Sequence, residues 1–192
     1  MRWNELFFAA YIASRPRLLG VAARGIYLPA YLNFEFVRDL DIQTVIDVGA
    51  SEGRVARALL ALLPDADVHA FEPVDSAFRR LHDISSEPRF SANQIAIADR
   101  VGSAAFYALP TFTPASSLFP VREPYRHLGG MTGPARVHRV STTTIDSYFA
   151  TRTLRGRALL KLDIQGAELL ALRGAERTLA AIDVIHCETA FV

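Results

Sequence analysis

The chain has 192 residues, of which 51% are hydrophobic and 21% are charged, and its formal net charge is +1. This length is enough for one globular domain with a sizeable core, and the near-neutral charge excludes a strong overall attraction to nucleic acid or anionic lipid. Cys187 is the only cysteine, which excludes an internal disulfide, and we therefore expect a cytoplasmic protein.

Residues 1–40 are predicted to form an N-terminal helical segment that is broken near Pro16 and Pro29. The apolar run at residues 6–13 is too short to span a bilayer, and no signal-peptide cleavage pattern follows it. We expect this run to cap the sheet or the active site. We expect no membrane-surface helix, because its polar face is not rich in lysine or arginine. The aromatic residues of the segment are interpreted as packing residues; they are Tyr27, Tyr31, Phe34 and Phe36.

Residues 44–73 are predicted to form a β-α-β unit. Residues 44–48 are β-branched and apolar apart from Asp47, which is typical of a buried parallel strand. A turn with glycines at 49 and 53 follows, and residues 54–63 carry apolar side chains at the spacing of one helix face. Residues 68–71 form the second strand, and Glu72 stands at its carboxyl end.

This unit has the chemistry of an adenosine-binding site. Its turn residues would lie close to a ligand because glycine lets the backbone approach; they are Gly49, Ala50, Ser51 and Gly53. Free N–H groups at the helix start would attract an anion. Glu72 could accept both ribose hydroxyls in charge-assisted hydrogen bonds. A dinucleotide site usually reads G-x-G-x-x-G, whereas here Asp47 replaces the first glycine, which suits the ammonium group of S-adenosylmethionine.

The remaining residues extend the α/β pattern as far as residue 187. Residues 74–84 are predicted to be helical, 90–98 and 104–109 extended, 136–142 a strand, and 144–148 a short helix with Thr144 as its cap. Residues 158–164 form another strand, Gly166 opens a helix, and residues 182–187 form the last strand. The segment 110–134 holds five prolines and three glycines, and we expect this long loop to cover the acceptor, with Ser116 and Ser117 lining the pocket.

Ionisable residues gather at the ends of the last two predicted strands. Asp163 follows a strand at the edge where doubly wound sheets bind ligands, and Lys161 shares its face, where an ion pair would fix the strand end. Asp163, Glu168 and His186 are the candidates for removing a proton from an acceptor. A metal site of Asp163, His186 and Glu188 is conceivable, but its spacing is not diagnostic, and we expect no metal.

Several motifs together resemble the FkbM family of S-adenosylmethionine-dependent methyltransferases over residues 42–192. The matching segments are Val45-Ile46-Asp47-Val48-Gly49-Ala50-Ser51-Glu52-Gly53, Phe71-Glu72-Pro73, Ala96-Ile97-Ala98-Asp99 with Gly102, Ser116-Ser117, Thr144-Ile145-Asp146, Leu160-Lys161-Leu162-Asp163-Ile164-Gln165-Gly166-Ala167-Glu168 and Arg173-Gly174-Ala175. The resemblance implies a Rossmann-like class I methyltransferase fold with a doubly wound, mostly parallel sheet. It also implies that Gln94, Ala96 and Asp99 lie near the adenine.

The sequence departs from the family pattern in three places. Gln165 stands where many members have glutamate, and Gln94 stands where asparagine is common. The sequence also stops just after the fifth core strand, so the last two strands of this class are expected to be missing. That would leave residues 182–187 with an unpaired edge, which invites pairing with a second copy of the chain. We expect either a shortened form or a homodimer through this edge.

The resulting hypothesis is an S-adenosylmethionine-dependent methyltransferase. The resemblance implies O-methylation of a small hydroxylated acceptor, such as a sugar or a secondary metabolite, with no nucleic acid as partner. Two alternatives stay open at this point. One is a nicotinamide-dependent oxidoreductase, because the β-α-β unit and Glu72 also fit the ribose of NAD. The other is a truncated cofactor-binding or assembly module without turnover.

Overall fold

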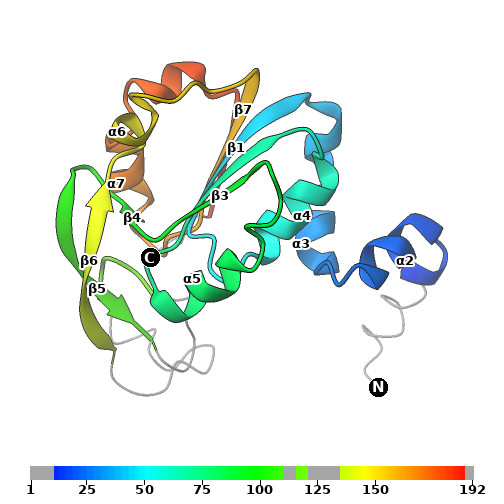
Figure 1. Ribbon diagram of the computed structural model, residues 1–192, viewed down its shortest axis with the longest axis horizontal. Coiled ribbons are helices and arrows are strands. Elements are labelled where there is room, and N and C mark those ends of the chain that lie inside the picture. The colour runs from blue at the N-terminus through cyan, green and yellow to red at the C-terminus, as the bar shows by residue number, and fades with distance from the viewer. Residues whose placement is uncertain (1–10, 110–115, 121–134, 189–192) are drawn as a thin grey trace.

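A parallel sheet of five strands forms the centre of the molecule (Figure 1). The computed structural model describes residues 11–109, 116–120 and 135–188. The strand order is β3-β2-β1-β7-β8, and every neighbouring pair is parallel. The strands are β1 (Ile42–Val48), β2 (Asp67–Phe71), β3 (Phe90–Asn93), β7 (Arg157–Leu162) and β8 (Val184–Cys187). This arrangement confirms the predicted Rossmann-like sheet.

Helices cover both faces of the sheet, as a doubly wound fold requires. One hydrophobic core joins the N-terminal helices, α4 (Arg54–Leu62) and α5 (Asp75–His82) to strand residues such as Val45 and Leu159. The other core joins α6 (Ile145–Phe149) and α7 (Glu168–Arg173) to Ile46, Leu160 and Leu162. Successive residues of β1 and β7 therefore point into opposite cores, which explains why both strands are apolar throughout.

The N-terminal segment packs directly on the first of these cores. It contains α2 (Pro16–Ala23), α3 (Leu28–Asn33) and a 3₁₀ turn, η1 (Glu35–Asp39). The predicted breaks near Pro16 and Pro29 are confirmed, because one helix ends before each proline and the proline lies in the first turn of the next helix. A proline is accepted there because its missing N–H has no helical partner in any case. The apolar run at residues 6–13 lies mostly outside the described residues.

A second, smaller sheet follows the first. It pairs β4 (Ala96–Ile97) with β6 (Arg136–Thr143) in parallel, and β6 with β5 (Gly102–Ala108) in antiparallel fashion. The single extended segment predicted for residues 90–98 was therefore wrong, since its two halves belong to different sheets. The chain bends between them, where the amide of Ile95 donates to the carbonyl of Asn93. The predicted Thr144 cap is confirmed by a bond from the amide of Ser147 to Thr144 Oγ1 at 2.9 Å.

The last part of the described chain returns to the main sheet. Helix α7 begins at Glu168 and not at Gly166 as predicted, because Gln165 and Gly166 have positive φ angles of 55° and 98°. A 3₁₀ turn, η5 (Thr178–Ala181), leads into β8. Within residues 11–188, as far as these are described, nothing pairs with the outer side of β8. The predicted homodimer through this edge stays a prediction.

The described residues contain no helix long and apolar enough to cross a membrane.

Candidate functional site

The turn after β1 brings the carboxyl ends of three strands together. Gly49 has a φ of 78°, and a side chain there would overlap the backbone carbonyl of Asp163, which follows β7. The amides of Gly49 and Ala50 both donate to the carbonyl of Phe71, which ends β2, at 3.0 Å. The turn uses these two amides to join β1 to β2, so they are not free to bind an anion. The predicted attraction of an anion to the helix start concerns the amides from Arg54 onward and stays a prediction.

Glu72 completes the link between the turn and β2. Its carboxylate accepts the amide of Ser51 at 3.0 Å and the amide of Val74 at 2.8 Å. The side chain is only 6% exposed. Burial raises the pKa of Glu72 to about 7, although the two amides and the charge of Lys161 act in the opposite direction. Backbone N–H groups thus fix the carboxylate of Glu72, the residue predicted to bind the ribose, and its oxygens can still accept further hydrogen bonds.

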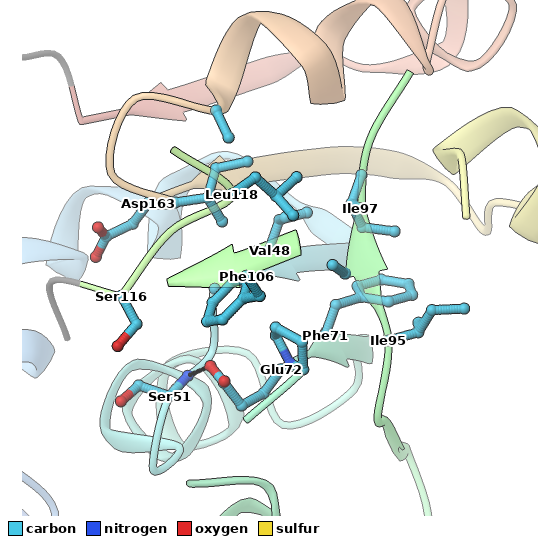
Figure 2. A pocket seen from close by; sticks show the side chains of 15 residues that line it. Val48, Ser51, Phe71, Glu72, Ile95, Ile97, Phe106, Ser116, Leu118 and Asp163 are labelled. Atoms are coloured by element: carbon cyan, nitrogen blue, oxygen red, sulfur yellow. Dashed lines mark hydrogen bonds between the residues drawn. The ribbon is translucent and has the colours of Figure 1, made fainter. Parts of the chain in front are cut away.

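A pocket lies in front of Glu72, between the two sheets (Figure 2). Ser51 and Glu72 stand on one side of it, and Asp163 stands at the end of β7. Its other walls are mostly apolar and come from Phe71 and from residues of and beside the second sheet; they are Ile95, Ala96, Ile97, Phe106 and Leu118. A carboxylate facing an apolar slot can bind a molecule with a flat ring and adjacent hydroxyls. The room inside is small, about 60 Å³.

Asp47 is completely buried and pairs with Lys161. The Asp47 Oδ1 to Lys161 Nζ distance is 2.9 Å, and the two residues are direct neighbours in the register of β1 and β7. Lys161 also donates to the carbonyl of Gly49 at 2.8 Å. Apart from this ion pair, no described donor contacts the Asp47 carboxylate. The expected ion pair of Lys161 is therefore present, and it anchors the glycine turn to the centre of the sheet.

Asp163 lies where the turn, β7 and β8 meet. Gln165 Nε2 donates to its Oδ1 at 2.7 Å, and its Oδ2 lies 3.8 Å from Lys161 Nζ. Glu188 follows β8 beside Asp163, since the amide of Glu188 donates to the carbonyl of Leu162 at 3.0 Å. Hydrogen bonding to Asp163 and the charge of Asp163 raise the pKa of Glu188 to about 7. Glu188 can therefore hold a proton near neutral pH beside the Asp163 carboxylate.

The other two predicted proton acceptors have different surroundings. Glu168 Oε1 accepts the amide of Ile164 at 3.0 Å, and its Oε2 accepts the amide of Gly166 at 2.9 Å, so this carboxylate orders the loop before α7. The ring of His186 lies 4.6 Å from the ring of Phe34, beneath the N-terminal segment. No group of three or more metal-binding side chains occurs among the described residues.

The predicted acceptor serines lie on the described part of the long loop. Ser116 lines the pocket of Glu72, and its Oγ accepts the amide of Leu109 at 3.0 Å. Ser117 Oγ donates toward the carbonyls of Ile164 and Gln165, at 3.1 and 2.9 Å, and thereby joins the loop to the end of β7. The predicted cover formed by segment 110–134 falls otherwise outside the described residues.

The predicted adenine contacts divide into two groups. Ala96 lines the pocket together with its neighbours Ile95 and Ile97. Gln94 instead points toward Asp75 at 3.5 Å, and Asp99 pairs with Arg100 at 3.1 Å, so neither side chain lines the pocket.

The apolar walls at Phe106 and Leu118 were not predicted, because an apolar residue that faces a ligand has the same sequence signature as one that faces the core. Gln165 was noted as a departure from the family, but its bond to Asp163 was not foreseen.

A parallel sheet of this order, with a glycine turn after β1 and an acid after β2, defines a Rossmann-like nucleotide-binding fold. The model of the Methyltransferase FkbM domain matches residues 47–192. The chain therefore belongs to the FkbM methyltransferase family.

Comparison with individual proteins gives more distant similarities. The 2-O-methyltransferase NoeI of Sinorhizobium fredii is 28% identical over 153 residues, which are 75% of this chain and 62% of that protein. The crystal structure of methyltransferase FkbM from Methylobacillus flagellatus KT is 20% identical, with a TM-score of 0.41, over 73% of this chain and 30% of that one. The plantazolicin methyltransferase BpumL, solved with a pentazolic desmethylPZN analog and SAH, is 11% identical, with a TM-score of 0.37, over 95% of this chain and 57% of that one. The chain thus spans about 62% of the length of its curated relative.

Proposed function

We propose that this chain binds S-adenosylmethionine in the crevice between the glycine turn and Glu72, with Asp47 buried beneath the turn instead of lining the crevice as predicted, and methylates a hydroxyl group of a small acceptor. The observation that carries the proposal is the buried Glu72 carboxylate, which ends β2, faces an apolar slot and is fixed by the amides of Ser51 and Val74. Family membership supports the reaction class. The name of the relative NoeI supports oxygen as the atom that receives the methyl group.

The glycine turn favours this cofactor over a dinucleotide. A pyrophosphate is bound by the glycine-rich turn as well as by the helix start. Here the turn amides of Gly49, Ala50 and Ser51 are bound to Phe71 and Glu72 and are not available to it. A fully buried carboxylate, Asp47, also lies behind the turn and would repel a phosphate, although Lys161 offsets much of its charge. An adenosine that carries a cationic side arm avoids both conflicts.

Each side chain has a separate part in the reaction. Bound S-adenosylmethionine supplies an electrophilic methyl group on its sulfonium. Glu72 accepts the ribose hydroxyls, and Ile95, Ile97 and Phe106 flank the adenine. Because the pocket is narrow, these apolar walls must move apart when the adenine binds. Asp163, oriented by Gln165, would accept the hydroxyl proton when the acceptor oxygen displaces the sulfonium sulfur from the methyl carbon, and that sulfur would leave as a neutral thioether. Glu188 stands beside Asp163, and hydrogen bonding to Asp163 raises the pKa of Glu188 to about 7.

Two measurements test the proposal. Calorimetric titration with S-adenosylmethionine and, separately, with NADH is expected to show binding of the first and weaker or no binding of the second. Transfer of a radiolabelled methyl group is then measured across a panel of sugars, phenols and other hydroxylated metabolites. Preference for NADH would refute the methyl-donor site, whereas cofactor binding with no transfer to any acceptor would favour a module without turnover.

A further inference from the structure

A second cavity lies on the other side of the glycine turn, toward the N-terminal segment. Its volume is about 760 Å³, within the range of sites that bury a whole small molecule. Tyr27, Pro29 and Asn33 contribute one wall, and Lys161 and Asp163 contribute the opposite wall at the end of β7. The proposed function has no use for the wall formed by the N-terminal segment, so its role needs a separate explanation.

The two cavities meet at the reacting end of the proposed site. Gly49, Ser51 and Asp163 line both of them, while Glu72 lines only the first and Tyr27 and Asn33 line only the second. A ligand whose ribose is held by Glu72 can therefore extend past Gly49 toward the larger cavity. Asp163, the proposed proton acceptor, stands at the junction, so a hydroxyl group entering from the larger cavity would meet it there.

The charges that line the larger cavity cancel. Lys161 is already paired with Asp47, and Arg54 lies 3.9 Å from Glu52. Arg54 also lies over the ring of Tyr27, 5.1 Å from its centre. Glu52 also pairs with Arg80, but the described lining balances Arg54 and Lys161 with Glu52 and Asp163, so it carries no net charge that would attract an anionic substrate. The uncharged part of the wall combines apolar surface with the exposed amide of Asn33, which suits a neutral molecule that has an apolar face and hydroxyl groups.

The wall is rigid enough to select a ligand. The side chains that fix α3 to the sheet are buried; Tyr31 is 5% exposed and Phe34 is 2% exposed. The ring of Phe34 lies against His186 of β8. The exposed Tyr27 and Asn33, at the two ends of this short helix, are thus held in place by packing on the same core as β1.

We propose that the cavity between α3 and the end of β7 binds the methyl acceptor, a neutral hydroxylated molecule with an apolar face, and that Tyr27 and Asn33 determine its specificity. The proposal rests on the proposed function, because the cavity becomes an acceptor site only if the cofactor's methyl group lies at Gly49 and Asp163. His186 then acts by supporting Phe34 and the helix, and not by accepting a proton.

The test uses p-nitrophenyl β-D-glucoside as a neutral probe and p-nitrophenyl β-D-glucuronide as its charged counterpart. Binding to the chain saturated with S-adenosylhomocysteine is measured by ligand-observed NMR for the unaltered chain, Tyr27→Ala, Asn33→Ala and Leu19→Ala. Leu19 is a matched control, since it is 49% exposed against 48% for Tyr27 and lines neither cavity. Affinity for S-adenosylmethionine is measured in parallel by calorimetry.

The glucoside is expected to bind more tightly than the glucuronide. Tyr27→Ala and Asn33→Ala should each weaken it by about tenfold, as for a residue that contributes substantially to an interface. Leu19→Ala should have no effect, and cofactor affinity should stay within about twofold in all variants, because neither Tyr27 nor Asn33 lines the Glu72 pocket. Failure of the glucoside to bind, equal binding in all variants, or a preference for the glucuronide would overturn the acceptor-site proposal. If the unaltered chain does not bind S-adenosylmethionine, the proposed function itself is refuted.

Discussion

Glu72 offers the sharpest test of the cofactor site. Replacing it with glutamine keeps its size but removes the negative charge that would accept the ribose hydroxyls. Hydrogen bonds to a charged group contribute about 1.5–3 kcal/mol, and losing that contribution corresponds to roughly 10- to 150-fold weaker binding. We therefore expect Glu72→Gln to raise the Kd for S-adenosylmethionine by this factor in a calorimetric titration. Glu87→Gln makes the same chemical change at an exposed residue outside the pocket and should leave Kd unchanged.

The pH dependence of binding adds a second readout. Because burial raises the pKa of Glu72 to about 7, the carboxyl is mostly protonated at pH 6 and mostly ionised at pH 8. If only the ionised form binds the ribose, affinity should increase about tenfold between these pH values. Titration of groups on the ligand changes the affinity of both variants equally. The contribution of Glu72 is therefore the difference in pH dependence between the unaltered chain and Glu72→Gln, and Glu72→Gln should lack the increase.

The same shift changes the stability of the ligand-free chain in the opposite direction. The folded-state pKa lies above the unfolded value of 4.5, so folding favours the protonated form. The corresponding stability is fully present below pH 4.5 and is lost as the pH rises through about 7, by roughly 3 kcal/mol in total. Between pH 6 and pH 8 the loss is about 1.4 kcal/mol, and thermal unfolding at these two pH values, again compared with Glu72→Gln, measures it.

Equal cofactor affinity in Glu72→Gln and the unaltered chain at pH 8 would refute the placement of the ribose.

Four further changes test other parts of the site and the fold. Asp163→Asn should lower the transfer rate about 10²- to 10⁴-fold with little change in cofactor Kd. It should also remove the change in rate near pH 7 that arises from Glu188, because the raised pKa of Glu188 depends on Asp163. A transfer rate with an unchanged pH profile would exclude this proton acceptor. Lys161→Met leaves the buried Asp47 charge without its partner and should lower the free energy of unfolding by about 3–5 kcal/mol, as measured with urea. Gly49→Ala should weaken cofactor binding and stability together, since its methyl group would displace the carbonyl of Asp163; wild-type behaviour would show that the turn can relax. Thr144→Ala removes the cap of α6 and should cost about 1 kcal/mol in the same urea experiment, with no effect on cofactor Kd.

Local sequence patterns were sufficient for the framework of the site. The β-branched strand of residues 44–48, the glycine turn, the helix after it and Glu72 at the end of β2 all follow one another in about 30 residues. Each is specified by periodicity, by a turn residue or by its place at a strand end. For that reason the β-α-β unit, its position in a parallel sheet and the placement of Glu72 in a pocket were predicted correctly.

Partners that are distant in the chain were decided only by the tertiary structure. Lys161 could have paired with Asp163, two residues away, but the register of β1 and β7 places it 2.9 Å from Asp47 and 3.8 Å from Asp163. Ser117 Oγ also bonds to the carbonyls of Ile164 and Gln165, 47 and 48 residues away, which no local pattern predicted. The wall formed by Tyr27 and Asn33 likewise arises because α3 and the end of β7, more than 100 residues later in the chain, line the same cavity. Hydrophobic periodicity specifies which face of an element is buried, but which polar groups then meet depends on strand register and packing, and those are properties of the whole fold.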